Sequence, residues 1–247
     1  ILMGIVMGIF MGYFHILMNT NLILTGVAIN TFTRGATVMI LYTFTGDKGS
    51  SSLVKSLAVG NWDIPVIKDI PILGQILSGH NGFTYFAFLA VIFTWFLMYR
   101  TPLGLRIRAV GENSSAAESV GENPAKSKLI ALGFSGFFSA LGGMYMSMGN
   151  MSVFITNMTG GRGFIGVAAD AMGRGNPIGA MLASLLFGAA NAVANVLQIN
   201  NFPVDMVMAI PYVVSIAGII IYSANEQHRK NSRVKQAIRA AEREETA

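Results

Sequence analysis

Six apolar stretches dominate this chain, and their length limits what it can fold into. They cover residues 1–18, 22–43, 83–99, 129–149, 178–198 and 205–223. A helix needs about 20 mostly apolar residues to cross a bilayer, and several of these stretches are long enough. The chain is 53% hydrophobic and 12% charged, whereas soluble domains usually carry about 25% charged residues. We therefore predict an all-α integral membrane protein, a polytopic helix bundle.

The positive charges are concentrated in two short stretches. The formal net charge of +5 is compatible with nucleic-acid binding. However, of the 17 Lys and Arg residues, five lie within 100–128 and six within 229–243. Membrane proteins concentrate Lys and Arg in their cytoplasmic connections. This distribution predicts that both stretches are cytoplasmic and that the chain binds no nucleic acid.

These runs and charges also predict the domain organisation. Residues 1–223 form a transmembrane domain that contains the polar connection 100–128, and residues 224–247 form a basic cytoplasmic tail. Because the chain starts at Ile1 inside an apolar run, with no signal-peptide charge before it, we expect this domain to be incomplete at its N-terminus.

The mixed segment 44–82 is predicted as an external loop with short interfacial pieces. Pro65 and Pro71 prevent a long helix there. Trp62 suits a membrane–water boundary, where aromatic side chains are enriched.

Three glycines in the first apolar run, Gly4, Gly8 and Gly12, recur every four residues. This spacing places them on one helix face, where a second helix can approach closely. The alternative is that glycine is merely tolerated in a membrane helix, and the spacing favours close packing.

Two charged residues interrupt apolar segments. Arg34 lies in the middle of the second run and should face protein or water, either on a pathway or in a structural role. Asp170 lies in the segment 164–173, which is too short for an ordinary crossing and is predicted as a half-helix or re-entrant segment. Asp170 is compatible with a proton relay or with a structural pair to Arg162 or Arg174.

No catalytic or metal-binding pattern is visible, and the chain is predicted not to be an enzyme. The sequence "GGRG" at 160–163 lacks the Gly-Lys-Ser/Thr ending of a phosphate loop. The three His residues have no metal-ligand spacing, the absence of Cys excludes disulfides and thiolate sites, and no Ser/His/Asp set stands in a catalytic context.

The stretch "RIRAVGENSSAAESVGENPAKSK", residues 106–128, is a polar island in this apolar chain. Asn113 or Ser114 can cap a short helix of about two turns, with Glu118 near its middle and Gly121 as a stop. Such a helix, presented by two membrane spans, is either a docking element for a cytoplasmic partner or an ordinary solvated loop.

The island and the helix after it resemble the ribose-type permeases of bacterial ABC importers. The residues that match that family's pattern are Gly104, Arg108, Ala109, Gly111, Glu112, Asn113, Ala116, Ala117, Gly121, Ser135, Gly136, Ala140 and Gly143. The elements Gly161–Phe164, Asn176–Gly179 and Leu186–Gly188, together with "WDIPVIKDIPILG", are similar to the simple-sugar and nucleoside branch. Asp170 departs from the more apolar helix usual in the family.

This resemblance implies a multi-pass permease in the bacterial plasma membrane. Its partners would be a cytoplasmic ATP-binding subunit that carries ATP and Mg, a second, paralogous permease subunit, and an extracytoplasmic substrate-binding lipoprotein. No cofactor would be bound by this chain. The residues implied to couple it to the ATPase are Arg108, Gly111, Glu112, Asn113, Ala116, Ala117, Glu118 and Gly121.

Substrate would pass by alternating access between packed spans, with the broken helix near the membrane midplane. The residues expected along this path are Asn30, Arg34, Asn157, Thr159, Arg162, Phe164, Asp170 and Asn191. Two alternatives stay open. One is an ion-coupled secondary transporter or channel in which Arg34 and Asp170 act as relay residues. The other, a membrane enzyme, is disfavoured because no nucleophile or metal set is visible.

Overall fold

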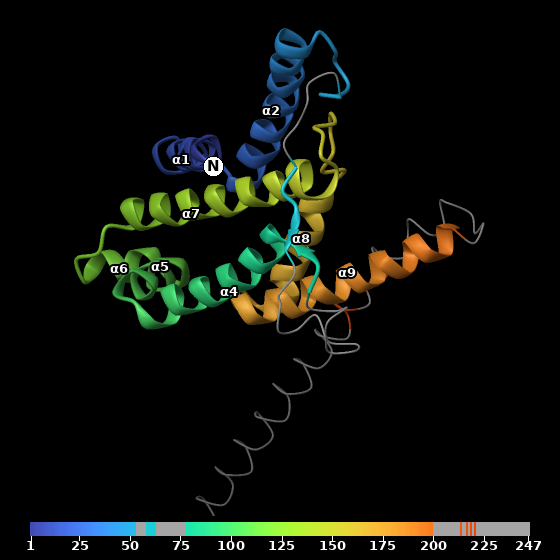
Figure 1. Cartoon of the computed structure of the whole chain (residues 1–247). Coiled ribbons are helices and arrows are strands. Elements are labelled where there is room, and N and C mark those ends of the chain that lie inside the picture. The colour runs from blue at the N-terminus through green and yellow to red at the C-terminus, as the bar shows by residue number, and fades with distance from the viewer. Residues whose placement is uncertain are drawn as a thin grey trace, which may run out of the picture. The chain divides into compact units, whose positions relative to one another are not determined.

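The computed structural model describes residues 1–52, 58–62 and 78–199, together with the helical positions 213, 216, 218 and 220 (Figure 1). The described chain is helical apart from two short strands and connecting turns. It divides into two compact units, Ile1–Gly160 and Gly161–Ala247. Most of the predicted run 205–223, the tail 224–247 and the prolines at 65 and 71 lie outside the described residues.

The apolar runs within the described residues form helices where they are predicted. In the first unit these are α1 (Leu2–Leu17), α2 (Leu22–Thr45), α4 (Gly82–Arg100) and α7 (Pro124–Met144), which continues as the π-helical turn η1 (Tyr145–Asn150). In the second unit they are α8 (Arg162–Gly173) and α9 (Pro177–Ile199). Four helices of the described chain are long and apolar enough to cross a membrane: 22–45, 82–100, 124–150 and 177–198. The chain is therefore a multi-pass membrane protein.

The predicted packing role of the first three glycines is confirmed. α1 lies against α7 (Figure 1), and a Cβ atom on Gly4 would come within 2.5 Å of both the Ala140 Cβ and the Gly136 carbonyl oxygen. A Cβ on Gly8 would collide with the Leu132 carbonyl oxygen, and one on Gly12 would lie 2.9 Å from Leu129 Cδ1. Only glycine permits this backbone-to-backbone approach.

The described parts of the loop 44–82 are held by short backbone pairings. β1 (Asn61–Trp62) pairs antiparallel with β2 (His80–Asn81). The buried side chain of Asn81 donates to the Val59 carbonyl and accepts from the Phe83 backbone N–H, which starts α4. The connection after α2 joins the segment after η1, because the Ser51 N–H donates to Phe154 O at 2.9 Å.

The predicted short helix 164–173 is present in the second unit as α8, which starts two residues earlier. It packs on α9, with Ala169, Ala183 and Phe187 buried between them. The turn between the two helices is tight, since a Cβ on Gly173 would collide with the Ala180 backbone N. Arg174 ends α8 in the left-handed conformation, with φ at 57°.

Candidate functional site

Two polar helices, α5 (Pro102–Glu112) and α6 (Ser114–Ser119), connect the membrane-crossing helices α4 and α7. We call residues 101–123 the polar element. Sequence reasoning predicts α6 but misses α5. Its signal is the pair Thr101-Pro102: the Thr101 hydroxyl accepts from the Gly104 N–H at 3.2 Å, and proline occupies the first turn. This is a standard helix start.

Asn113 serves both polar helices. Its backbone N–H donates to Ala109 O at the end of α5, and its side-chain oxygen accepts from the Ala116 N–H at 3.1 Å to cap α6. The cap is therefore Asn113 and not Ser114, whose hydroxyl instead donates back to Val110 O. The helices are joined without a flexible linker, because one residue is the cap of both.

The turn after α6 is fixed by a glycine and an ion pair. Gly121 has a φ of 88°, and its N–H donates to Glu118 O at 2.9 Å. This confirms Gly121 as the predicted stop, although α6 is only six residues long and Glu118 lies next to its end. Glu122 then pairs with Arg106 of α5, with Nε and Oε1 2.8 Å apart. These contacts close the element on itself.

The polar element is anchored directly to the crossing helices. A Cβ on Gly104 would collide with the Leu97 carbonyl oxygen of α4, so α5 starts in backbone contact with α4. The Arg108 guanidinium lies over the Tyr99 ring at 4.6 Å. Val110 and Ala117 are buried, and α5 and α6 both contact α7. The element is therefore packed directly against both α4 and α7.

The predicted coupling residues divide between the two sides of this element. Ala117 is buried and supports the packing of α6. The others are exposed: Arg108, Gly111, Glu112, Asn113, Ala116, Glu118 and Gly121. Sequence reasoning missed two large apolar side chains of the exposed side, Leu105 at 66% and Val120 at 80% exposure. Val120 could have been identified from the sequence, because it is an apolar residue within a polar segment.

A polar cavity of about 490 Å³ lies beside the polar element. It is lined by His15 of α1 and Asn19 of the connection between α1 and α2, by Glu118 of α6, and by Asn123 and Lys128 at the start of α7. The His15 Nδ1–H donates to Thr20 O at 2.8 Å and fixes this connection. The cavity brings the α1–α2 connection next to the end of α6.

The predicted substrate-path residues fall on several elements. Asn30 and Arg34 lie one turn apart on α2, and both are exposed. In the first unit, Asn157 and Thr159 follow η1, and Asn157 has a φ of 60°. The second unit carries Arg162, Phe164 and Asp170 on α8 and Asn191 on α9. Their common path stays a prediction.

No cluster of three or more His, Asp or Glu side chains that could hold a metal ion occurs within the residues that the structure describes. The geometry instead offers an element that is held stiffly between two crossing helices and exposes one face. This face is accessible for contact with a partner.

Comparison with known proteins identifies the family of this chain. The family described as the permease component of the branched-chain amino acid transport system matches residues 1–221. The nucleoside ABC transporter permease protein NupC of Lactococcus lactis subsp. cremoris is 30% identical over 231 residues, which is 90% of this chain and 72% of that protein. The guanosine ABC transporter permease protein NupQ of Bacillus subtilis is 33% identical, over 79% of this chain and 62% of that protein. The ribose import permease protein RbsC of Bacillus subtilis is 28% identical, over 58% of this chain and 44% of that protein. No solved structure matches the chain.

Proposed function

The chain belongs to the family of branched-chain amino acid transport system permease components, and from this premise we propose that it carries substrate across the membrane in an ATP-driven importer. Its relatives are permease components of ABC transporters, named for nucleosides, guanosine and ribose. The substrate of this chain is accordingly a nucleoside or a simple sugar, moved by alternating access.

The observation that carries this proposal is the polar element. It is stiff, since Asn113 caps both of its helices and Arg106 closes it onto Glu122. It is anchored at both ends to membrane-crossing helices. It also exposes the apolar side chain of Val120, which is therefore available for contact with a partner. These properties suit a surface on which a cytoplasmic ATP-binding subunit docks and through which its conformational change moves the crossing helices.

ATP and Mg²⁺ would bind to that separate subunit, since the "GGRG" of this chain lacks the residues of a phosphate loop. The exposed residues of the polar element, Arg108, Gly111, Glu112, Asn113, Ala116, Glu118 and Gly121, would contact it, with Ala117 as internal support. The chain itself would then be the permease and not the ATPase.

Two further partners belong to the proposal. Lactococcus lactis has a second nucleoside permease protein, NupB, beside NupC, and Bacillus subtilis has NupP beside NupQ. This pairing supports a second, paralogous permease chain. A substrate-binding lipoprotein would deliver substrate from outside the bacterial plasma membrane. The path would be lined by Asn30, Arg34, Asn157, Thr159, Arg162, Phe164, Asp170 and Asn191, of which Arg34 most needs a polar environment.

The test is uptake by liposomes that contain the full-length permease, its neighbouring permease, the ATPase and the binding protein. Val120→Asp places a charge on the docking surface without filling any packed space. We expect ATP-dependent uptake of labelled nucleoside to fall at least tenfold, with a matching loss of ATPase binding to the permease.

Met151→Asp is the matched control, because Met151 is also a solvent-exposed apolar residue but follows η1, far along the chain from the polar element. It should keep both ATPase binding and coupling. The double variant Glu112→Ala/Glu118→Ala tests the charged residues of the same surface. Uptake that continues without the ATPase under an ion gradient, and that ignores Val120→Asp, would refute the importer and favour the ion-coupled carrier with Arg34 and Asp170 as relays.

A further inference from the structure

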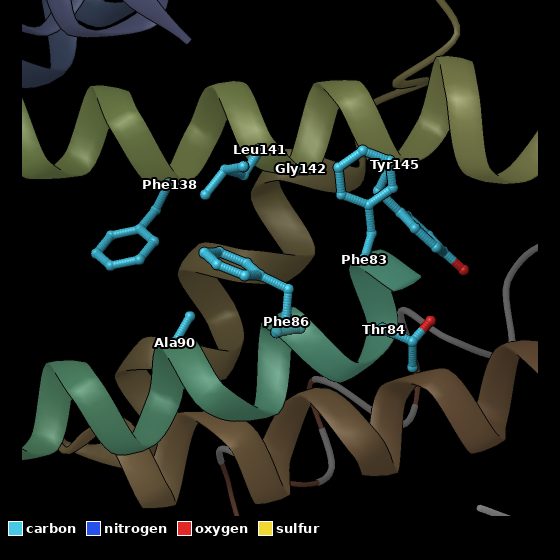
Figure 2. Close-up of a pocket in the computed structure, with 9 residues that line it drawn as sticks. Phe83, Thr84, Phe86, Ala90, Phe138, Leu141, Gly142 and Tyr145 are labelled. Carbon is cyan, nitrogen blue, oxygen red and sulfur yellow. The ribbon is translucent and has the colours of Figure 1, made fainter. Parts of the chain in front are cut away.

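A second cavity, of about 370 Å³, lies between α4 and α7. Four aromatic rings line it, Phe83 and Phe86 from α4 and Phe138 and Tyr145 from the α7 side, and Figure 2 shows Phe86 and Phe138 directed into the space between the two helices. Small-molecule sites in proteins typically have volumes of about 300–1,000 Å³, aromatic walls and few polar groups. The cavity has these features.

The polar groups of this cavity are the hydroxyls of Thr84 and Tyr145. Thr84 lies in the first turn of α4, Tyr145 is the first residue of η1, and α4 and η1 contact each other. Both hydroxyls are therefore at the same end of the cavity, and the aliphatic Ala90 and the Phe138 ring are toward the other.

Thr84 differs from the other threonines of the crossing helices. Hydroxyls of Thr31, Thr33, Thr43 and Thr94, among others, donate to the carbonyl four residues earlier. Thr84 has no helical carbonyl at that position, because α4 starts at Gly82. Within the described chain neither the Thr84 nor the Tyr145 hydroxyl makes a hydrogen bond, so both are available to a ligand.

The chemistry of the lining selects among ligands. No lining residue is charged, and a phosphate group would be desolvated there without a counter-charge, which is costly. A free sugar carries hydroxyls around its whole ring, and the apolar walls would leave most of them unpaired. A lipid chain would leave both hydroxyls unpaired in an apolar place. A flat heterocycle uses the rings by stacking and the hydroxyls by hydrogen bonding at its edge.

We propose that the cavity between α4 and α7 binds the base of a neutral nucleoside, with Phe86 and Phe138 as the stacking residues and Thr84 and Tyr145 as the hydrogen-bonding residues. This inference rests on the proposed function, and it narrows the substrate to neutral nucleosides and nucleobases. It also places the ligand on α7, the helix that starts at the polar element.

The test measures direct binding of labelled guanosine to the purified, full-length permease pair, without the lipoprotein, so that the lipoprotein's affinity does not mask the site. Unlabelled guanine should compete, whereas ribose and guanosine monophosphate should compete at least tenfold more weakly. Phe138→Leu should weaken binding about tenfold through loss of stacking. Phe88→Leu on α4, which removes a ring that does not line the cavity, should stay within about twofold of the unmodified protein.

Substitutions at two glycines test the cavity without removing an aromatic ring. A Cβ on either Gly142 or Gly143 would meet no atom within 4 Å, but only Gly142 lines the cavity. Gly142→Leu should abolish guanosine binding while ATPase docking persists, and Gly143→Leu should preserve both.

Equal binding by Phe138→Leu, Gly142→Leu and their controls, in a complex that still takes up guanosine with ATP, would overturn the base site and leave the importer intact. A changed content of co-purified phospholipid with unchanged guanosine binding would identify a lipid as the occupant and likewise overturn it. Absence of ATP-dependent nucleoside uptake by the unmodified complex would overturn the proposed substrate, and with it this inference.

Discussion

The two faces of α7 differ in how closely they approach their neighbours. Toward α1, Gly136 meets Gly4 and Gly8 with backbone against backbone. Toward α4, Phe138 and Tyr145 border a cavity of about 370 Å³. With 3.6 residues per turn, these two sets lie on nearly opposite sides of the same helix.

This contrast indicates that the two faces of α7 have different roles. The α1 contact is tight enough that α1 and α7 should move as one body, because packed cores resist continuous deformation. The α4 contact leaves space that a change in helix position can open or close. Since α7 is capped at its start by Asn123 of the polar element, a displacement there would reach the cavity along a continuous helix.

The largest expected effect on stability comes from disrupting the close packing between α1 and α7. Gly136→Ala inserts a methyl group against the Gly4 carbonyl, and such overpacking should lower the free energy of unfolding in detergent by about 2–3 kcal/mol. Gly133→Ala is the matched control on the same helix, since its Cβ meets nothing within 4 Å, and it should be neutral or stabilising by up to about 1 kcal/mol. Equal effects of the two substitutions would mean that α1 and α7 are not in close contact.

Truncating one leucine on each face of α7 compares how well the two faces are packed. Leu132 packs against Gly8 and Gly12, whereas Leu141 borders the cavity. Leu132→Ala should destabilise by about 1–2 kcal/mol through lost packing, and Leu141→Ala by less than about 0.5 kcal/mol, because it enlarges an existing space. Thermal unfolding of the two variants in one detergent compares them directly. A larger cost for Leu141→Ala would show that the cavity face is the better packed.

A third prediction concerns the start of α7. The Asn123 side chain accepts from the Lys126 N–H at 3.1 Å. Asn123→Ala should cost about 1 kcal/mol, and Asn123→Asp, which keeps the acceptor, should cost little. Hydrogen exchange of the first turn of α7 reports the change locally. If exchange there is unaltered by Asn123→Ala, the link from the polar element to α7 does not depend on this cap.

The smallest effect is expected at the ion pair between Arg106 and Glu122. The Arg106 side chain is 59% exposed, and exposed pairs contribute about 0.2–1 kcal/mol. Arg106→Gln should therefore lower stability only slightly, and the difference from the unmodified protein should shrink as salt is raised. A difference that persists in high salt would indicate that Arg106 acts through packing of its alkyl chain.

Much of the fold could be predicted from the sequence because it depends on local patterns. The apolar runs set the crossing helices, Gly121 set the stop of α6, and Gly4, Gly8 and Gly12 set a packing face. The helix α5 was missed because its polar composition hides a periodicity that becomes meaningful only once Val110 is buried by its neighbours.

An all-α membrane protein with a polar element between two crossing helices follows from the amino-acid sequence alone. Apolar runs long enough to cross a bilayer must satisfy their backbone hydrogen bonds internally, and this leaves few alternatives to helices. Its resemblance to a permease family also depended on local motifs. The packing of the helices, in contrast, buries Ala117 and exposes Val120. It also places glycines against one face of α7 and a cavity along the other. These properties depend on which helix lies opposite, and that choice is made by contacts between residues far apart in the chain.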